Sequence, residues 1–370
     1  MSERDIFADA IDNFLAPIKQ LLDDDAVTEV MINGPQSIFV EKGGKLFPTD
    51  ASFKDEDSLV AAVNNIAQSV GRVIDQNHPT LDARLPAPWN YRVHAVIPPC
   101  ARNGTTVAIR KFTKTQMTLK DYIRMNTITP DAAQFLDLSV FLGKNILVSG
   151  GTGSGKTTLL SVLAGRIPPG QRVIVIEDAS ELTVDYEHVV FFETKMSDEL
   201  GQGEVTIRDL LKSSLRLRPD RIIVGEVRSA EALELINAMN TGHKGCFGTI
   251  HSNSTSDALV RLEALAMGAD AKVSEKAIAQ QISSAIDLVI QISRFSDGSR
   301  RIQSISEVHG LNPNGGYIVE PIFELGHLVR QADGKLKGDL EPTGILPTFM
   351  EEIESNRIPF ARDKFKKRAA

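Results

Sequence analysis

Short and nearly continuous hydrophobic runs mark the middle of the chain. They are NILVSG at 145–150, RVIVIED at 172–178 and RIIVGE at 221–226, and they alternate with segments of helical spacing. Such runs are typical of parallel strands that are buried on both faces of an α/β sheet. Beyond about residue 285, the runs DLVIQISRF and GYIVEPIFEL predict a terminal antiparallel meander.

The amino-terminal third has a different pattern. Apolar positions in 6–22 have nearly helical spacing, although Pro17 interrupts it. The segment 27–47 predicts two short strands around the Gly34-Pro35 turn, and Leu59, Val63, Ile66 and Val70 mark one helix face. Further strands separated by Pro and Gly follow up to about residue 112. This mixture predicts a small α+β domain.

The chain therefore divides into four predicted parts. With 370 residues it exceeds the usual size of one domain. We predict an α+β domain at 1–112, a linker or hinge at 113–130 and an α/β domain with the meander at 131–325. A polar tail at 326–370 ends in the basic stretch DKFKKRAA.

Composition excludes several classes of protein. The net charge of -7 argues against a protein that coats nucleic acid, and no direct nucleic-acid contact is expected. Cys100 and Cys246 lie far apart, which disfavours a disulfide framework or a cysteine zinc site and fits a reducing compartment. No apolar run approaches the roughly 18 residues of a transmembrane segment, and the acidic start does not resemble a secretory signal. We expect a cytoplasmic protein that meets a membrane only through partners.

The segment NILVSGGTGSGKTTLLSVLAG contains the pattern G-x4-G-K-[ST], with Gly150, Gly155, Lys156 and Thr157 at the defining positions. An apolar strand precedes the pattern and an apolar helix follows it, which is the context that a phosphate-binding loop requires. Backbone amides in such a loop surround phosphate oxygens, and the helix N-terminus adds its positive dipole end. The residues predicted to bind the nucleotide are Gly151, Thr152, Gly153, Ser154, Gly155, Lys156, Thr157 and Thr158.

Hydrolysis at this loop requires one group that positions or deprotonates the attacking water and another that holds Mg²⁺. Lys156 brings a positive charge to the β and γ phosphates, and Thr157 is a predicted Mg²⁺ ligand. Glu177 and Glu226 end two of the apolar runs, and ligands of open parallel sheets gather at such strand ends. We predict that Glu177 activates the attacking water and that Glu226 helps to hold the metal ion. Asp178 is equally well an orienting group or a helix-start residue, and Glu181 is interpreted as structural.

Histidines occur on the segment GHKGCFGTIHSNS. His251 follows an apolar run, and there it can donate a hydrogen bond to a γ-phosphate. His243 is as well explained as an ordinary surface or core residue. A metal site formed by these two residues with Cys246 matches no known spacing and lacks a fourth ligand.

Arginines and lysines form two further candidate groups. Arg208, Lys212 and Arg216 lie on one predicted helix face, which is either a solvated stripe or a contact with another subunit or a nucleotide. Arg218 and Arg228, on either side of the Glu226 run, have better positions for such a contact. The predicted first domain adds Arg84, Arg92, Arg102 and Arg110, and guanidinium groups stabilise charge on a transferred phosphoryl group.

Taken together, these motifs resemble the superfamily of secretion ATPases that drive type II secretion, type IV secretion and type IV pili. GGTGSGKT resembles its Walker A motif and VIVIEDASEL its Asp box. LRLRPDRIIVGEVR resembles its Walker B region and AMNTGHKGCFGTIHSNS its His box. The resemblance runs from 31–35 to 342–347. It implies a RecA-like P-loop NTPase domain with a smaller α+β N-terminal domain, and ATP with Mg²⁺ as ligands.

Within the superfamily, INGP, LRLRPDRIIVGEVR and AMNTGHKG are most similar to the CpaF-type motor of the tight-adherence (Tad/Flp) pilus. Two features depart from that branch: Ser229 follows GEVR where glycine is common, and APWNY precedes Arg92 where a short Asp-Gly-Ser turn is usual. The resemblance implies a homohexamer at the inner membrane, bound to platform proteins. It also implies that Arg92 and Arg110 reach the phosphates, and that the domains close about 113–130 during hydrolysis.

Two alternatives stay open at this stage. A conjugative, DNA-transfer type of secretion ATPase shares all four motifs, and the acidic charge disfavours it slightly. The other alternative is a scaffold that binds ATP and hardly hydrolyses it. The presence of both Glu177 and Glu226 argues against such a scaffold, since it could dispense with one of them.

Overall fold

Two sheets with different topologies organise the chain. The computed structural model describes residues 11, 13–85, 89–111, 117–197, 201–269 and 273–367. The first unit contains Met1–Thr115 and Asp198–Gln202, and the second unit contains Gln116–Ser197 and Gly203–Ala370. Three predicted segments lie partly outside the described residues. These are 6–10 and 12 of the predicted helix at 6–22, 113–116 of the predicted linker and 368–370 of the basic stretch.

The sheet of the first unit is antiparallel, with strand order β3-β2-β1-β6-β5-β4. Its strands are β1 (Val27–Asn33), β2 (Ile38–Lys42), β3 (Lys45–Pro48), β4 (Thr80–Arg84), β5 (Arg92–Val96) and β6 (Thr106–Arg110). Within the described residues, the helices of this unit include η1 (Ala16–Ile18), α2 (Lys19–Asp23) and α3 (Glu56–Ser69).

Helix α3 begins with a capping box, in which the Asp55 side chain accepts from the Ser58 amide and the Ser58 side chain accepts from the Asp55 amide. These two bonds satisfy amides that a helix start otherwise leaves unpaired. The helix buries Leu59, Val63 and Ile66 in the core of this unit, while Val70 follows its end and is exposed.

The sheet of the second unit has the order β17-β14-β13-β12-β7-β11-β10-β8-β9. Six strands run parallel: β7 (Ile146–Ser149), β8 (Val173–Glu177), β9 (Val189–Glu193), β10 (Arg221–Val227), β11 (Phe247–Ile250) and β12 (Leu288–Arg294). The sheet continues antiparallel through β13 (Arg300–Leu311), β14 (Tyr317–Leu325) and β17 (Leu340–Pro342).

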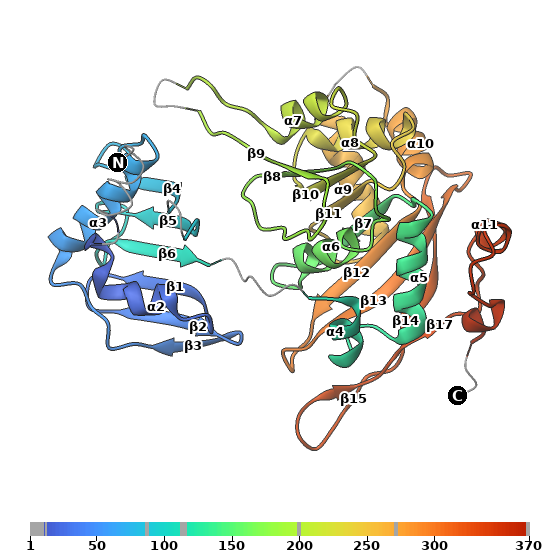
Figure 1. The fold of residues 1–370 in the computed structure, drawn as a ribbon, viewed down its shortest axis with the longest axis horizontal. Helices are drawn as coiled ribbons and strands as arrows, with labels where there is room; N and C mark the ends of the chain where they lie inside the picture. Colours follow the sequence, from blue (N-terminus) through green and yellow to red (C-terminus); the bar gives the residue numbers. More distant parts are fainter. Residues whose placement is uncertain are drawn as a thin grey trace. The chain divides into compact units, whose positions relative to one another are not determined.

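Helices cover both faces of this sheet (Figure 1). One core contains residues of α5 (Pro130–Phe141) and α6 (Lys156–Ala164). The other contains residues of α7 (Ile207–Ser214), α8 (Glu231–Asn240), α9 (Thr255–Met267) and α10 (Glu275–Ala285). Strands buried on both faces explain why the runs of β7, β8 and β10 lack polar alternation.

The carboxyl-terminal residues form β15 (Val329–Arg330), β16 (Leu336–Lys337), α11 (Met350–Ser355) and η2 (Arg362–Phe365). Aromatic side chains from 349–365 pack against α5. Phe349, Phe360 and Phe365 surround Phe135 of α5, with ring centroids 5.6–6.4 Å from it. The span predicted as a linker also contains a short helix, α4 (Leu119–Arg124). No helix in the described part of the chain is long and apolar enough to cross a membrane.

Candidate functional site

The loop between β7 and α6 has the geometry of an anion site. Gly155 stands at the N-cap of α6 with φ +96°, and no side chain caps the amides of the first helical turn. A Cβ on Gly155 would lie 3.2 Å from Cδ of Arg300, and a Cβ on Gly150 would lie 2.3 Å from the carbonyl oxygen of Ile292. Glycine is therefore required at both positions, by close approach and, at Gly155, also by a left-handed backbone.

Several donors converge inside this loop on a single acceptor. The carbonyl oxygen of Gly151 accepts from Lys156 Nζ at 3.1 Å, from Ser154 Oγ at 2.9 Å and from Ser154 N at 3.4 Å. Burial lowers the pKa of Lys156, while the charge of Glu226 raises it. An ammonium group, a hydroxyl and a main-chain amide directed at one point fit a phosphate oxygen. Thr157 lies half-buried in the first turn of α6, where a Mg²⁺ ligand is predicted, and Thr158 is exposed beside it.

Glu226 of β10 lies near the lysine and is engaged by a neighbouring arginine. Arg228 Nη2 lies 2.5 Å from Glu226 Oε2, and Arg228 Nη1 lies 3.4 Å from Asp178 Oδ2. The backbone of this arginine is also fixed, because Glu231 Oε1 accepts from Arg228 N at 2.5 Å. The ends of β8 and β10 thus carry a connected set of charges. Glu181, interpreted from sequence as structural, also acts on the pKa of Lys156.

Glu177, the residue predicted to activate water, is only 3% exposed. Its Oε1 accepts from the amides of Glu181 and Leu182, both at 2.9 Å. A Cβ on Gly225 of the adjacent strand would lie 2.9 Å from Glu177 Cγ. Burial raises the pKa of Glu177 to about 7, against the lowering effect of the two amides. A carboxyl that titrates near neutrality can exchange a proton under ordinary conditions.

Other predicted residues divide between the two units. His251 follows β11 and is half-buried at the same edge of the sheet as Glu226. In the first unit, Arg92 pairs in register with both Arg110 and Arg84, so three arginines form one row across β4, β5 and β6. Arg92 Nη2 also lies 3.7 Å from Asp82 Oδ1.

Two residues of the predicted charged face at 207–216 form ion pairs with a glutamate of the same unit. Arg208 Nε and Lys212 Nζ lie 3.0 and 3.5 Å from Glu234 Oε1 on α8. Because α7 ends at Ser214, Arg216 lies beyond the helix. These pairs favour the interpretation of the stripe as a structural surface over a ligand contact.

Sequence reasoning missed Arg300, the first residue of β13. Its Nε donates to the carbonyl oxygen of Gly153 at 3.0 Å, so a guanidinium group lies against the loop. The two residues are 147 positions apart in sequence. The only signal in the sequence was an arginine pair after the SDGS turn, which is a common feature of hairpins.

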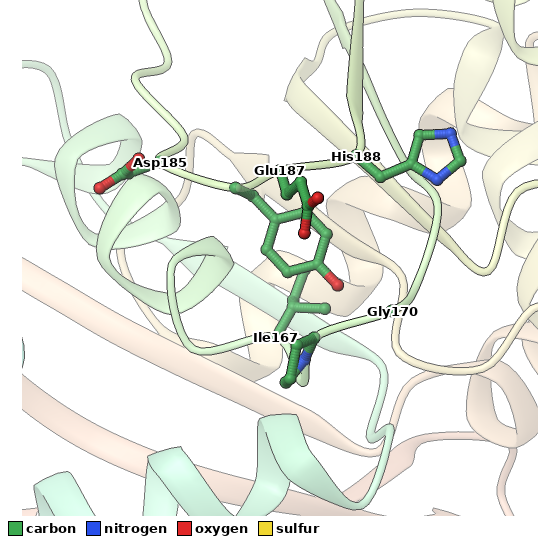
Figure 2. Close-up of a pocket in the computed structure, with 7 residues that line it drawn as sticks. Ile167, Gly170, Asp185, Glu187 and His188 are labelled. Atoms are coloured by element: carbon green, nitrogen blue, oxygen red, sulfur yellow. The ribbon is translucent and has the colours of Figure 1, made fainter.

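An open pocket of about 590 Å³ lies at the opposite edge of the sheet. Figure 2 shows Ile167, Gly170, Asp185, Glu187 and His188 around it, all from segments that precede β8 or β9. Its size would suit a small ligand. However, the pocket lies at the amino ends of these strands, while Glu177 and Glu226 lie at the carboxyl ends. The acidic Asp185 and Glu187 also disfavour a triphosphate there.

Comparison with known proteins places the chain among secretion proteins. Residues 12–316 match the family described as Type II/IV secretion system protein. A putative conjugal transfer protein of Mycobacterium tuberculosis is 36% identical over 293 residues, which cover 78% of this chain and 83% of that protein. Conjugal transfer protein TrbB of Rhizobium radiobacter is 33% identical over 296 residues, which cover 79% and 87%.

A solved structure has a similar fold. The pilus retraction motor PilT with bound ADP has a TM-score of 0.55 at 20% identity, and the match covers 92% of this chain and 86% of that chain. At this identity the likeness concerns the fold alone. Together with the family match it confirms the predicted α/β fold class.

Proposed function

Because the chain belongs to the Type II/IV secretion system protein family, we propose that it is an ATPase motor of a pilus or secretion machine. The observation that carries this proposal is the convergence of Lys156 Nζ and Ser154 on one point inside the loop, beside the charge of Glu226. PilT, which has a similar fold, was solved with bound ADP. This supports ATP as the nucleotide.

The proposed reaction is attack of water on the γ-phosphorus of ATP, which breaks the terminal P–O bond and releases ADP and phosphate. The loop amides and Lys156 hold the β and γ phosphates, and His251 donates a hydrogen bond to the γ-phosphate. Glu177 orients the water and takes its proton. Thr157 and Glu226 would hold Mg²⁺, which when bound neutralises charge on the phosphates. The oxygen donors of these two residues suit that ion.

We propose further that six copies act as a ring on the cytoplasmic side of the inner membrane, bound to platform proteins. The support is the family to which the chain belongs together with its motif resemblance. The proposal assigns Arg92 and Arg110 to phosphate binding. Arg92 and Arg110 are register partners on the neighbouring strands β5 and β6, which supports a joint role. Arg92→Ala and Arg110→Ala should then raise the KM for ATP.

Two machines are candidates for this motor. The sequence runs INGP and AMNTGHKG favour assembly of a tight-adherence pilus of the CpaF type. The names of the relatives in Mycobacterium tuberculosis and Rhizobium radiobacter favour conjugal transfer instead. A strain that lacks the chain separates the two: loss of surface pili with normal DNA transfer supports the first, and the reverse supports the second.

Phosphate release by the purified full chain tests the enzymatic proposal. We expect Lys156→Ala and Glu226→Gln each to reduce turnover by about 100-fold or more. The first variant loses the ammonium charge that holds the phosphates, and the second loses the carboxylate proposed to hold Mg²⁺. Lys276→Ala on the exposed face of α10 is a matched control that should leave turnover unchanged. Equal turnover in the wild type and both site variants would refute the proposal.

A further inference from the structure

The hairpin formed by β12 and β13 brings a guanidinium group to the outer side of the phosphate loop. Arg300 Nε donates to the Gly153 carbonyl oxygen at 3.0 Å. The Cδ atom of Arg300 also lies 3.2 Å from the position of a Cβ on Gly155. One side chain therefore packs against both positive-φ glycines of the loop, Gly153 at +69° and Gly155 at +96°.

Peptide geometry connects this outer contact to the inner face of the loop. The carbonyl of Gly153 and the N–H of Ser154 belong to one planar trans peptide, so they point in opposite directions. When Arg300 holds the carbonyl outside, the N–H is directed inward. There it meets the Gly151 carbonyl oxygen at 3.4 Å, the same oxygen that Lys156 Nζ contacts at 3.1 Å. The long N–H contact is a weak one that a phosphate oxygen can replace.

The turn that presents Arg300 is itself held firmly. Asp297 accepts from Ser299 N at 3.0 Å, from Ser299 Oγ at 2.6 Å and from Leu336 N at 2.8 Å. Arg301, next in sequence, donates to the carbonyl oxygens of Leu336 and Gly338. The turn at 295–299 is therefore tied to β16, and the carboxyl-terminal residues help to fix the position of Arg300.

We propose that Arg300 is a positioning residue for the nucleotide, which sets the phosphate-binding form of the loop from outside through the Gly153 peptide. The inference rests on the proposed function and adds a residue to the same site. Within the described residues, Nη1 and Nη2 of Arg300 have no hydrogen-bond partner, so the Nε bond is the polar contact of this side chain with the loop. Arg300 should therefore affect the binding of the phosphates and not the binding of the nucleotide base.

Binding of phosphates to the full chain tests this role. The two probes are a non-hydrolysable ATP analogue and inorganic tripolyphosphate, which has no base or ribose. Arg300→Ala should weaken both by the same factor of about five to ten, the size of one hydrogen bond. Arg300→Lys, which keeps a donor, should recover part of the affinity. Arg294→Ala is the matched control, because Arg294 is the register partner of Arg300 on the same hairpin. It should bind both probes as the wild type does.

Each other outcome has a distinct meaning. Unchanged affinity in Arg300→Ala overturns the inference, as does a loss for the ATP analogue alone, which would indicate contact with base or ribose. An equal loss in Arg294→Ala, or a lower unfolding temperature of ligand-free Arg300→Ala, would show a merely structural role. If the wild type binds neither probe, the proposed function itself fails.

Discussion

The guanidinium of Arg228 lies between two carboxylates, 2.5 Å from Glu226 Oε2 and 3.4 Å from Asp178 Oδ2. Glu226 belongs to β10 and Asp178 directly follows β8, and these strands are neighbours in the sheet. The arginine therefore links the ends of two neighbouring strands, whose segments resemble a Walker B region and an Asp box. It holds the orientation of Glu226 through the shorter contact.

Replacement of Arg228 should therefore affect the chemical step more than nucleotide binding. For Arg228→Ala we expect kcat to fall by about tenfold while the KM for ATP stays within about twofold, because an interaction that acts on Glu226, a residue of the proposed catalytic site, is lost. Arg228→Lys keeps the charge but not both contacts and should be intermediate. Steady-state kinetics measure both constants, and exposed Arg216→Ala is the control. A raised KM with unchanged kcat would place Arg228 on the nucleotide instead.

Glu177 gives the folded protein a specific dependence on pH. Its pKa rises from 4.5 to about 7 chiefly because of burial, so between these values the folded state keeps a proton that the unfolded state releases. Stability must then fall as the pH rises through this window, by about 3 kcal/mol in total. Glu177→Gln stays neutral and keeps an acceptor for the amides of Glu181 and Leu182.

Denaturant unfolding of both proteins at about pH 4 and about pH 8 checks this effect. The variant should gain about 3 kcal/mol relative to the wild type at the higher pH. Exposed Glu187→Gln is the control and should show no such gain. A stability difference between Glu177→Gln and the wild type that stays constant with pH would show that the pKa of Glu177 is the same in the folded and unfolded states.

Local patterns explain what the sequence could predict. The loop motif and the runs that became β7, β8 and β10 depend on neighbouring residues, so their type and order were readable. Strand β9 was not predicted. It lies at the edge of the sheet and pairs with one strand. Its apolar residue Phe191 is exposed, so the hydrophobic pattern of β9 does not match its burial. Edge strands lack the two-sided packing that gives central strands their continuous pattern.

Relationships between distant residues could not be predicted in the same way. The contact from Arg300 to Gly153 depends on the pairing of β12 with both β7 and β13. The division of the chain at 112, 130 and 325 stays a prediction. Within the described residues, the side chains of Phe349, Phe360 and Phe365 join the core of the second unit, which polar composition in 326–370 did not indicate.

Gly245 lies against a buried arginine, and its replacement should be severely destabilising. Arg221 is 4% exposed, and its guanidinium donates to Gln171, Lys244 and Val140. A Cβ on Gly245 would lie 1.3 Å from Arg221 Nη1, so Gly245→Ala must displace this group. We expect a loss of about 3 kcal/mol or more in unfolding free energy.

The neighbouring Gly242 offers a matched control for this prediction. It also has a positive φ, +101°, but nothing lies within 4 Å of a Cβ at that position. Gly242→Ala should therefore cost only the backbone strain of about 1–2 kcal/mol. Denaturant unfolding compares the two variants directly. Equal losses would mean that the guanidinium of Arg221 moves aside without cost.

The aromatic cluster at α5 predicts that the carboxyl-terminal residues contribute to the stability of the second unit. The ring of Phe365 is 1% exposed and lies edge-on to Phe135 at 5.6 Å, with Phe360 at 5.2 Å. Phe365→Ala should lower the unfolding free energy by about 3–5 kcal/mol, because a large side chain leaves a cavity. Phe141→Ala on the same helix is the control, since that ring is 54% exposed and should lose less than about 1 kcal/mol. Similar small losses in both variants would show that η2 is not part of the cooperative unit.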